Sequence, residues 1–244
     1  RQGFLSVCQD FYRLLLGPLE DAINTKSLII VPHGAMHKVP FAALNDGKQF
    51  IVDKYAVSVV PSSTVIEYVA KKRNKNEGRF LAFSNPETDY VSLAFAEIEV
   101  KNILSLFSKK EIYFKSEATE TRVKERDNFA DIVHFASHGQ FNDKQPMQSG
   151  LLVSKDLHND GFLQVHEIFG LNLRNANLVV LSACETALSK IYGGDDLVGL
   201  SRGFIYAGAP SILATLWSVD DRSTSILIKE FYENWKKKGM NKPE

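Results

Sequence analysis

Cysteine is scarce in this chain, and its scarcity limits how the fold can be held together. Cys8 and Cys184 are the two cysteines among 244 residues, and they lie far apart in unrelated sequence contexts. A disulfide framework of the kind that supports small secreted domains is therefore not expected. This cysteine usage predicts a cytoplasmic protein, because a reducing compartment keeps thiols free.

Net charge and long apolar runs are also lacking. Lys and Arg total 29, as do Asp and Glu, so charge gives no reason to expect a nucleic-acid or anionic-membrane partner. The longest apolar runs have the length of strands, so we expect neither a secretory signal nor a membrane-spanning helix. What is present is ordinary for a globular protein, with 44% hydrophobic and 24% charged residues in a chain able to bury a large core.

Segments with strand and helix patterns alternate along the whole chain. Strand patterns cover 27–31, 50–61, 79–84, 111–115, 131–139, 178–186 and 211–215, with a short hairpin at 150–153 and 161–163. Helical spacing covers 4–23, 62–72, 94–107, 119–129, 197–206 and 221–238. This alternation predicts one α/β domain over 1–244, with a mostly parallel sheet flanked by helices. The polar stretches 140–149 and 189–196 are predicted to be mobile loops.

Apolar residues recur at helical spacing in two of these helices. In the helix over 94–107, Phe95, Ile98 and Ile103 predict one core-facing stripe. In the first helix, Cys8 lies on the apolar face, so we expect a small buried hydrophobe rather than a reactive thiol. The chain opens at Arg1, not Met, directly into this helical pattern, and we therefore expect a fragment of a longer protein with its regulation upstream.

Two apolar runs each end in one reactive side chain. Residues 131–139 lead to His138 and residues 178–186 lead to Cys184, and both runs are rich in β-branched and aromatic residues. The carboxyl ends of parallel strands line the ligand crevice of an α/β sheet. If the strands are neighbours, imidazole and thiol emerge side by side, which is the minimum apparatus of a thiol nucleophile. A lone Cys184 would be an inert buried thiol; its pairing with His138-Gly139 favours a cysteine peptidase.

The chemistry of such a pair is simple. Histidine beside a thiol lowers the thiol pKa from about 8.5 and later protonates the leaving amine. The backbone N–H groups of Gly139 and Cys184 are candidates for an oxyanion hole, and losing one such donor costs about 10²–10³-fold in rate. No third catalytic side chain is evident in the sequence, and a backbone carbonyl would orient the imidazole equally well.

The two strand-end motifs resemble the signature blocks of CHAT domains, which are caspase-like cysteine peptidases of the clan that includes caspases and separases. The blocks are His134-Phe135-Ala136-Ser137-His138-Gly139 and Leu181-Ser182-Ala183-Cys184-Glu185-Thr186-Ala187. Further similar blocks follow in order: Pro32-His33-Gly34 with 39–44, 150–153 with Asp160-Gly161 and Glu167-Ile168, 200–204, and 207–209 through 216–221. The resemblance therefore covers nearly the whole chain.

This resemblance implies a caspase-like α/β/α sandwich with His138 as general base and Cys184 as nucleophile. It also implies an oxyanion hole from the backbone of Gly139 and Cys184. The family often joins this domain to TPR-type repeats or other sensor modules, so a regulatory upstream domain or partner protein is expected to control activity. Bacterial defence, including CRISPR-associated defence, and programmed death are contexts that the resemblance alone suggests.

Substrate preference depends on the residues beside Cys184. The acidic residues near the motifs are Asp156, Glu185, Asp195, Asp196, Asp220 and Asp221, and a buried carboxylate among them would favour a basic side chain before the scissile bond. We expect Asp156 and Asp195 to bind substrate, although Asp156 also fits a turn and Asp220 or Asp221 a helix cap. Trp217, just after a strand, is expected to line an apolar part of the pocket.

Metal and nucleotide chemistry are not expected. His134 and His138 are four residues apart on a strand, which separates them by about 13 Å, too far for one metal ion. His134 is instead expected to be a buried, hydrogen-bonded core residue. Gly193-Gly194 lacks the spacing and the Lys-Ser/Thr of a P-loop. We therefore expect no cofactor, no metal and no nucleic-acid or membrane partner.

The sequence thus predicts a cysteine endopeptidase that cleaves a specific protein or peptide substrate through an acyl-enzyme. The alternative from another class is a catalytically silent regulatory or docking module that keeps the caspase-like fold. Transfer of the acyl group to an amine on the same Cys-His dyad is a third possibility.

Overall fold

The computed structural model describes residues 2–71, 78–126, 130–140, 142, 144–185, 194–216 and 219–244. Within these ranges the side chains of residues 2, 38, 184, 185 and 194–198 are not described. The chain divides into two compact units, Arg1–Ile66 with Met240–Glu244, and Glu67–Gly239. In the described part of the chain, no helix is both long enough and apolar enough to span a membrane.

The first unit packs short elements around a small core. Its helices and 3₁₀ turns are α1 (Gln2–Leu15), η1 (Gly17–Ala22), η2 (Gly34–Lys38), η3 (Phe41–Ala43) and α2 (Ile51–Lys54), and its parallel strands are β1 (Ser27–Ile30) and β2 (Ala56–Val59). Tyr12 of α1 and Leu16, which directly follows this helix, pack with Phe41, Leu44 and Ile51. Cys8 is buried at 3% exposure, as predicted, and this burial raises the pKa of its thiol.

The strand predicted over 50–61 begins later than expected. Ile51–Lys54 form the helical turn α2, and only Ala56–Val59 form a strand. The carboxylate of Asp53 accepts the N–H of Phe50 at 3.2 Å, and Ile51 is fully buried. A side-chain cap and one anchored apolar residue therefore favour a helical turn where the alternating pattern predicted a strand.

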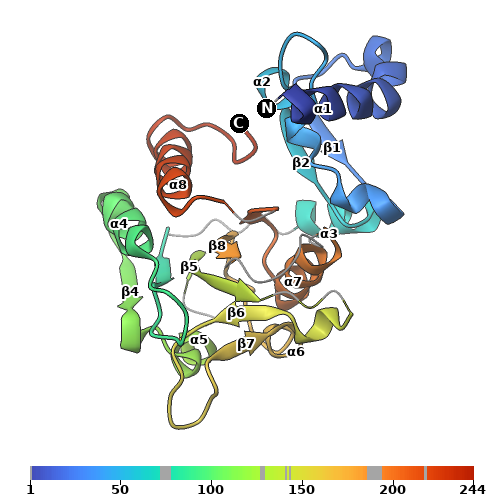
Figure 1. Cartoon of the computed structure of the whole chain (residues 1–244). Coiled ribbons are helices and arrows are strands. Elements are labelled where there is room, and N and C mark those ends of the chain that lie inside the picture. The colour runs from blue at the N-terminus through green and yellow to red at the C-terminus, as the bar shows by residue number, and fades with distance from the viewer. Residues whose placement is uncertain are drawn as a thin grey trace. The chain divides into compact units, whose positions relative to one another are not determined.

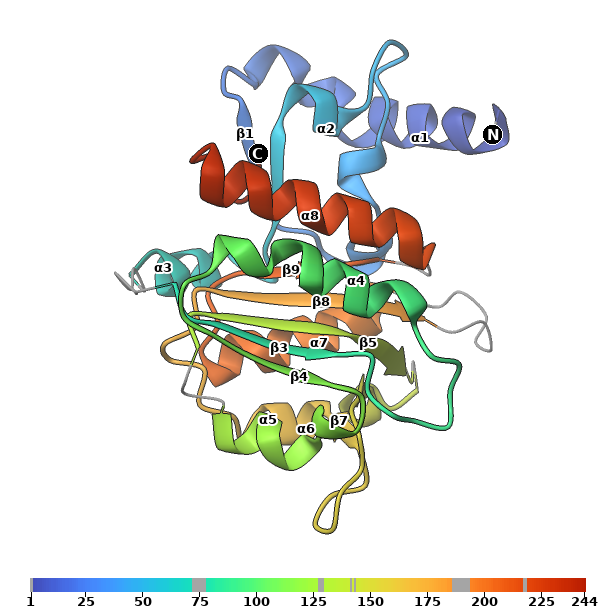
Figure 2. The ribbon, with the colours of Figure 1, turned by 90° about the vertical axis from the view of Figure 1, so that its left-hand side faces the viewer.

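The second unit is built on a seven-stranded sheet. Its strands are β3 (Phe80–Ser84), β4 (Lys110–Phe114), β5 (Ile132–Gln140), β6 (Gly150–Leu152), β7 (Phe162–Gln164), β8 (Leu178–Glu185) and β9 (Ile212–Ala214). β6 pairs antiparallel with β5, and β7 pairs antiparallel with β6 (Figure 1). The remaining strands are parallel throughout, in the order β4-β3-β5-β8-β9 (Figure 2). The prediction of an α/β fold with a mostly parallel sheet is confirmed.

Helices cover both faces of this sheet. They are α4 (Ala94–Ile103), α5 (Glu120–Arg126), α6 (Val165–Ile168), α7 (Gly194–Ala207) and α8 (Asp221–Lys237). The sequence of α3 (Ser63–Lys71) spans the boundary between the units. Short 3₁₀ turns are η4 (Leu104–Leu106), η5 (Lys115–Glu117) and η6 (Pro146–Gln148). Figure 2 shows α4 and α8 on one face of the parallel strands and α5, α6 and α7 on the other. The result is the three-layer sandwich expected of a caspase-like fold.

The two central strands contribute to two separate cores. On β5, Val133 and Phe135 pack in the core that contains residues of α5, α6 and α7, whereas Ile132 and Ala136 pack in the core with α4 and α8. Both faces of the strand are therefore buried, which explains why its sequence is a continuous apolar run rather than an alternating one. His138 lies two residues beyond Ala136 and belongs by alternation to the α4 and α8 face.

The antiparallel hairpin attaches at the carboxyl end of β5, beyond the last residue paired with β3. Gly139 of β5 pairs with Leu151 of β6 on one edge and with Glu185 of β8 on the other. Close packing requires glycine at position 150, because a Cβ there would lie 2.5 Å from the carbonyl oxygen of Leu163. The hairpin predicted at 150–153 and 161–163 thus borders the end of β5 that carries His138.

Two helix predictions need adjustment. Helix α4 ends at Ile103 and continues as the 3₁₀ turn η4, and its buried face holds Ala96, Glu99, Val100 and Ile103. Ile98, predicted to face the core, is 45% exposed. Helix α7 begins at Gly194, inside the predicted loop 189–196, while 189–193 lie outside the described residues.

Candidate functional site

His138 and Cys184 are direct partners in the parallel register of β5 and β8. The strands lie side by side in the centre of the sheet (Figure 2), and adjacent strands are about 4.8 Å apart. The backbones of the two predicted catalytic residues therefore meet near the carboxyl ends of neighbouring strands. Burial on both faces produces the two strands, and their parallel pairing produces the juxtaposition.

The imidazole of His138 is buried and held by a backbone carbonyl. It is 3% exposed, and its Nε2 lies 2.7 Å from the carbonyl oxygen of Val91. A carbonyl only accepts hydrogen bonds, so Nε2 carries the proton in this arrangement. Nδ1 has no hydrogen-bond partner among the described residues and is also buried. Its lone pair is therefore the position from which His138 can accept a proton.

Tyr90 packs against the same imidazole. Its ring centroid lies 5.7 Å from that of His138, at an interplanar angle of 45°. The hydroxyl of Tyr90 accepts a hydrogen bond from Nε2 of Gln140, which lies two residues after His138 on β5. Neither Tyr90 nor Val91 stands out in the sequence, because a lone aromatic residue in a loop and a backbone carbonyl carry no pattern.

Asp221 provides a negative charge near His138. Its Oδ2 accepts the N–H of Phe95 at 2.9 Å, at the start of α4. Burial raises the pKa of Asp221, and the charges of Glu99 and Asp220 add to the rise, while the Phe95 hydrogen bond and the charge of His138 oppose it. The neighbouring Asp220 caps α8 by accepting Ser223 N at 2.8 Å, as predicted for a helix start.

The residues predicted to bind substrate have three different placements. Asp156 lies in the β6–β7 hairpin, where its carboxylate accepts the N–H groups of Thr121, His158 and Asn159. Burial alone would raise its pKa, but these hydrogen bonds outweigh burial and lower the pKa to about 2. Asp195 lies in the first turn of α7 with its side chain outside the described set, and Trp217 lies outside the described residues.

His134, four residues before His138 on β5, is part of a buried polar network. Its Nε2 lies 2.9 Å from Oε1 of Glu99, and its Nδ1 lies 3.2 Å from the hydroxyl of Tyr232. The other oxygen of Glu99 accepts the hydroxyl of Ser182 at 2.9 Å. The prediction that His134 is a buried, hydrogen-bonded core histidine is confirmed. The network joins α4, β5, β8 and α8 on the face of the sheet that carries His138.

Metal ligation finds no support in the described part of the chain, since no three His, Cys, Asp or Glu side chains there gather into a set that could hold an ion.

Comparisons with known proteins point to one family. The family model described as CHAT domain matches residues 5–244. Tetratricopeptide repeat protein 28 of Homo sapiens is 23% identical over 283 aligned residues, covering 91% of this chain. The Mus musculus protein of the same name is 22% identical, also over 91% of this chain. The chain spans 11% of the length of each relative.

Proposed function

Because the chain belongs to the CHAT family, whose fold is caspase-like, we propose that it is a cysteine endopeptidase with Cys184 as nucleophile and His138 as general base. The register pairing of these two residues carries the proposal. The buried Nδ1 of His138 supports it, because this nitrogen has no hydrogen-bond partner among the described residues and a general base needs a free lone pair.

In the proposed reaction, Nδ1 of His138 takes the proton of the Cys184 thiol, and the thiolate attacks the carbonyl carbon of the scissile peptide bond. The backbone N–H groups of Gly139 and Cys184 stabilise the oxyanion of the tetrahedral intermediate. His138 then donates its proton to the leaving amine, and a thioester remains on Cys184. Water, deprotonated by His138, hydrolyses this acyl-enzyme and restores the thiol.

Two groups stabilise the imidazolium that forms during this cycle. The carbonyl of Val91 accepts the Nε2 proton, which leaves the lone pair of Nδ1 to take the thiol proton in the proposed cycle. The charge of Asp221 interacts favourably with that of His138. The proposed dyad therefore uses a backbone carbonyl where serine proteases use a carboxylate side chain.

Substrate recognition and control complete the proposal. Asp195 and Trp217 are proposed to line the pocket for the residue before the scissile bond. Asp156 is the weakest of the three proposed binding residues, because its carboxylate already accepts three backbone N–H groups. The relatives are named as tetratricopeptide repeat proteins, so we propose that an upstream repeat domain or a partner protein regulates the dyad.

Activity-based labelling tests this function. A panel of peptidyl acyloxymethyl ketones with Arg, Asp, Leu or Met before the warhead is incubated with the protein, and intact mass with peptide mapping locates the adduct. We expect an adduct on Cys184 that is lost in His138→Ala and retained in the control Cys8→Ser. Adducts formed equally well in His138→Ala would count against the dyad and favour a silent docking module.

A further inference from the structure

The carbonyl that accepts the hydrogen bond from Nε2 of His138 belongs to a loop with no regular secondary structure. Residues 85–93 connect β3 to α4, and we name this segment the histidine loop. Its Val91 provides the carbonyl that receives Nε2 of His138 at 2.7 Å. The side chain of Val91 is 81% exposed, so its packing contributes little to fixing that carbonyl. The position of the acceptor must therefore be set by neighbouring residues of the loop.

Asn85 closes the histidine loop at its base. Its backbone N–H donates to the carbonyl of Ala136 on β5 at 2.8 Å, and it adopts a left-handed conformation with φ of 48°. Its side-chain Oδ1 accepts both the hydroxyl of Ser92 and the N–H of Leu93, each at 3.0 Å. One buried amide therefore holds the two ends of the loop together.

A second attachment lies near the middle of the loop. The N–H of Glu87 donates to the hydroxyl of Ser154 at 2.8 Å, and that hydroxyl donates to the carbonyl of Lys115 at 2.7 Å. These bonds hold the backbone of the loop at Glu87. The segment from Thr88 to Val91 still requires its own attachment.

Tyr90 provides that attachment, and it does so on the strand that carries the histidine. Its hydroxyl accepts the amide N–H of Gln140, and its ring packs against the imidazole of His138. β5 therefore carries the imidazole of His138 and also, through Gln140, holds Tyr90. Tyr90 is the residue next to Val91, whose carbonyl accepts the Nε2 proton. Movement of Tyr90 would move the Val91 carbonyl away from Nε2.

We propose that Tyr90 is a positioning residue for His138: through its hydrogen bond to Gln140 and its ring contact, it fixes the Val91 carbonyl and so selects the imidazole form protonated at Nε2. This inference rests on the proposed role of His138 as general base. Tyr90 itself takes no part in bond making. Without it the imidazole can rotate or change tautomer, and Nδ1 presents its lone pair for a smaller fraction of the time.

The tautomer of His138 is the most direct readout. Long-range proton–nitrogen spectra of protein labelled with ¹⁵N-histidine distinguish protonation at Nε2 from protonation at Nδ1, and His138→Ala assigns the signal. The spectra are recorded with Cys184→Ala in every protein, so that no thiolate keeps the imidazole charged, and in the protein that retains Tyr90 we expect a neutral ring protonated at Nε2. Tyr90→Phe keeps the ring and removes the acceptor, and we expect a mixture of both forms. A spectrum identical to that of the protein that retains Tyr90 would overturn the inference.

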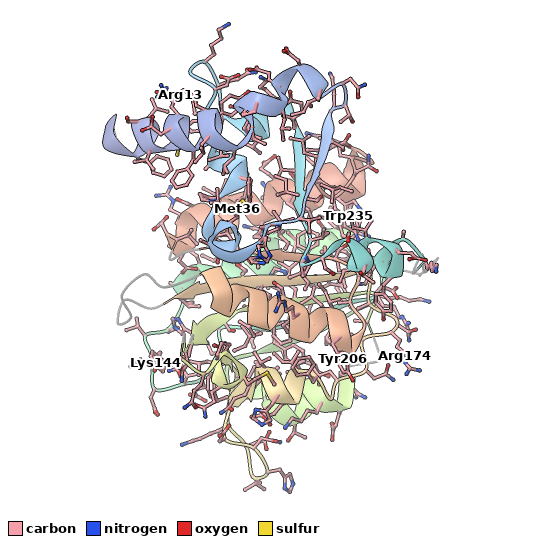
Figure 3. The ribbon with its side chains drawn as sticks, turned by 90° about the vertical axis from the view of Figure 1, so that its right-hand side faces the viewer. Arg13, Met36, Lys144, Arg174, Tyr206 and Trp235 are labelled. Atoms are coloured by element: carbon pink, nitrogen blue, oxygen red, sulfur yellow. The ribbon has the colours of Figure 1, made fainter. Side chains whose placement is uncertain are left out.

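The rate of Cys184 alkylation by iodoacetamide gives a second readout that requires no substrate. In Tyr90→Phe we expect a fall of roughly 10-fold, because small misplacements of a catalytic group cost rate steeply. Gln140→Ala removes the other partner and should give the same fall, and the double variant should be no slower than either single variant. Tyr206→Phe, at a tyrosine of α7 that is 72% exposed and labelled in Figure 3, is the matched control and should match the wild type.

The outcomes separate this inference from the function on which it rests. If alkylation in the wild type is as slow as in His138→Ala, the proposed dyad fails, whatever the tautomer spectrum shows. If alkylation depends on His138 but Tyr90→Phe and Gln140→Ala change neither the rate nor the spectrum, the dyad stands and the positioning role of Tyr90 is wrong. Additive effects of the two substitutions would also contradict the role, because they would show independent contributions.

Discussion

The carbonyl oxygen of Val91 lies 2.7 Å from Nε2 of His138. A backbone group therefore orients the imidazole, and the identity of the side chain at this position has little bearing on the chemistry. The remaining ring nitrogen, Nδ1, is buried and has no hydrogen-bond partner among the described residues. This single contact determines which nitrogen acts in the proposed mechanism.

Replacement of Val91 should consequently be mild. Val91→Ala keeps the carbonyl and shortens a side chain that is 81% exposed, so we expect a stability change within about 0.5 kcal/mol. Labelling of Cys184 by the ketone probe should proceed at the wild-type rate. Thermal unfolding and labelling kinetics check this together, and a large loss of labelling in a well-folded Val91→Ala protein would show that the side chain, not the carbonyl, matters.

The buried network around Glu99 should govern stability. Glu99 is 1% exposed and joins His134 to Ser182, so Glu99→Ala leaves both partners buried without it. We expect a loss of about 3–5 kcal/mol in the free energy of unfolding, as for other broken buried pairs. Glu99→Gln keeps the shape and one acceptor and should cost less, roughly 1–3 kcal/mol. Urea titrations measure both, and equal costs for the two variants would show that hydrogen bonding is not what Glu99 supplies.

Asp156 should stabilise the fold in a pH-dependent way. Its folded-state pKa is lowered from the ordinary value of 3.8 to about 2, so its contribution is fully present above about pH 4 and is lost as pH falls toward 2. The shift corresponds to at most about 2.5 kcal/mol, and solvent screening of this partly exposed side chain reduces that figure. Asp156→Asn should therefore be less stable than the wild type near neutral pH, and the gap should narrow in acid. Urea unfolding at several pH values measures the difference in the free energy of unfolding between the two proteins. A difference that grows in acid would show that Asp156 does not stabilise the fold in its charged form.

Gly150 should tolerate no side chain. A Cβ at this position would meet the Leu163 carbonyl oxygen at 2.5 Å and the Phe162 ring at 2.9 Å. We expect Gly150→Ala to cost about 1–3 kcal/mol through overpacking of the β6–β7 hairpin. Gly199→Ala is the matched control, because its Cβ would meet Pro146 at an ordinary 3.6 Å and alanine favours the α7 helix. Similar melting temperatures for Gly150→Ala and the wild type would contradict the close approach.

The sequence predicted the features that burial imposes. β5 and β8 are buried on both faces, and this produces the apolar runs that predicted them and the parallel pairing of His138 with Cys184. Helix α4 shows where pattern reasoning fails. Its apolar spacing predicted that Ile98 faces the core, yet Ile98 is 45% exposed and Glu99 is buried, because the carboxylate bonds to His134 and Ser182. Hydrogen-bond partners distant in sequence leave no local signal.

The sequence predicted the reactive groups of the site but not the groups that orient and surround His138. His138 and Cys184 lie in recognisable motifs, whereas the Val91 carbonyl is a group that every residue has. Tyr90 and Asp221 approach His138 only because the histidine loop and the start of α8 pack there. Such contacts depend on tertiary structure, so sequence reasoning left the orienting group open.

The pH dependence of Cys184 alkylation tests the central claim most directly. In a Cys8→Ser background, the mass gained with iodoacetamide reports Cys184 alone, and the rate is followed from about pH 5 to about pH 9.5 with and without His138→Ala. A dyad predicts substantial alkylation of Cys184 near pH 6, and in His138→Ala alkylation only as pH approaches about 8.5, the range of a free thiol. Superimposable profiles for the two proteins would contradict the account, because they would show that His138 does not activate the thiol.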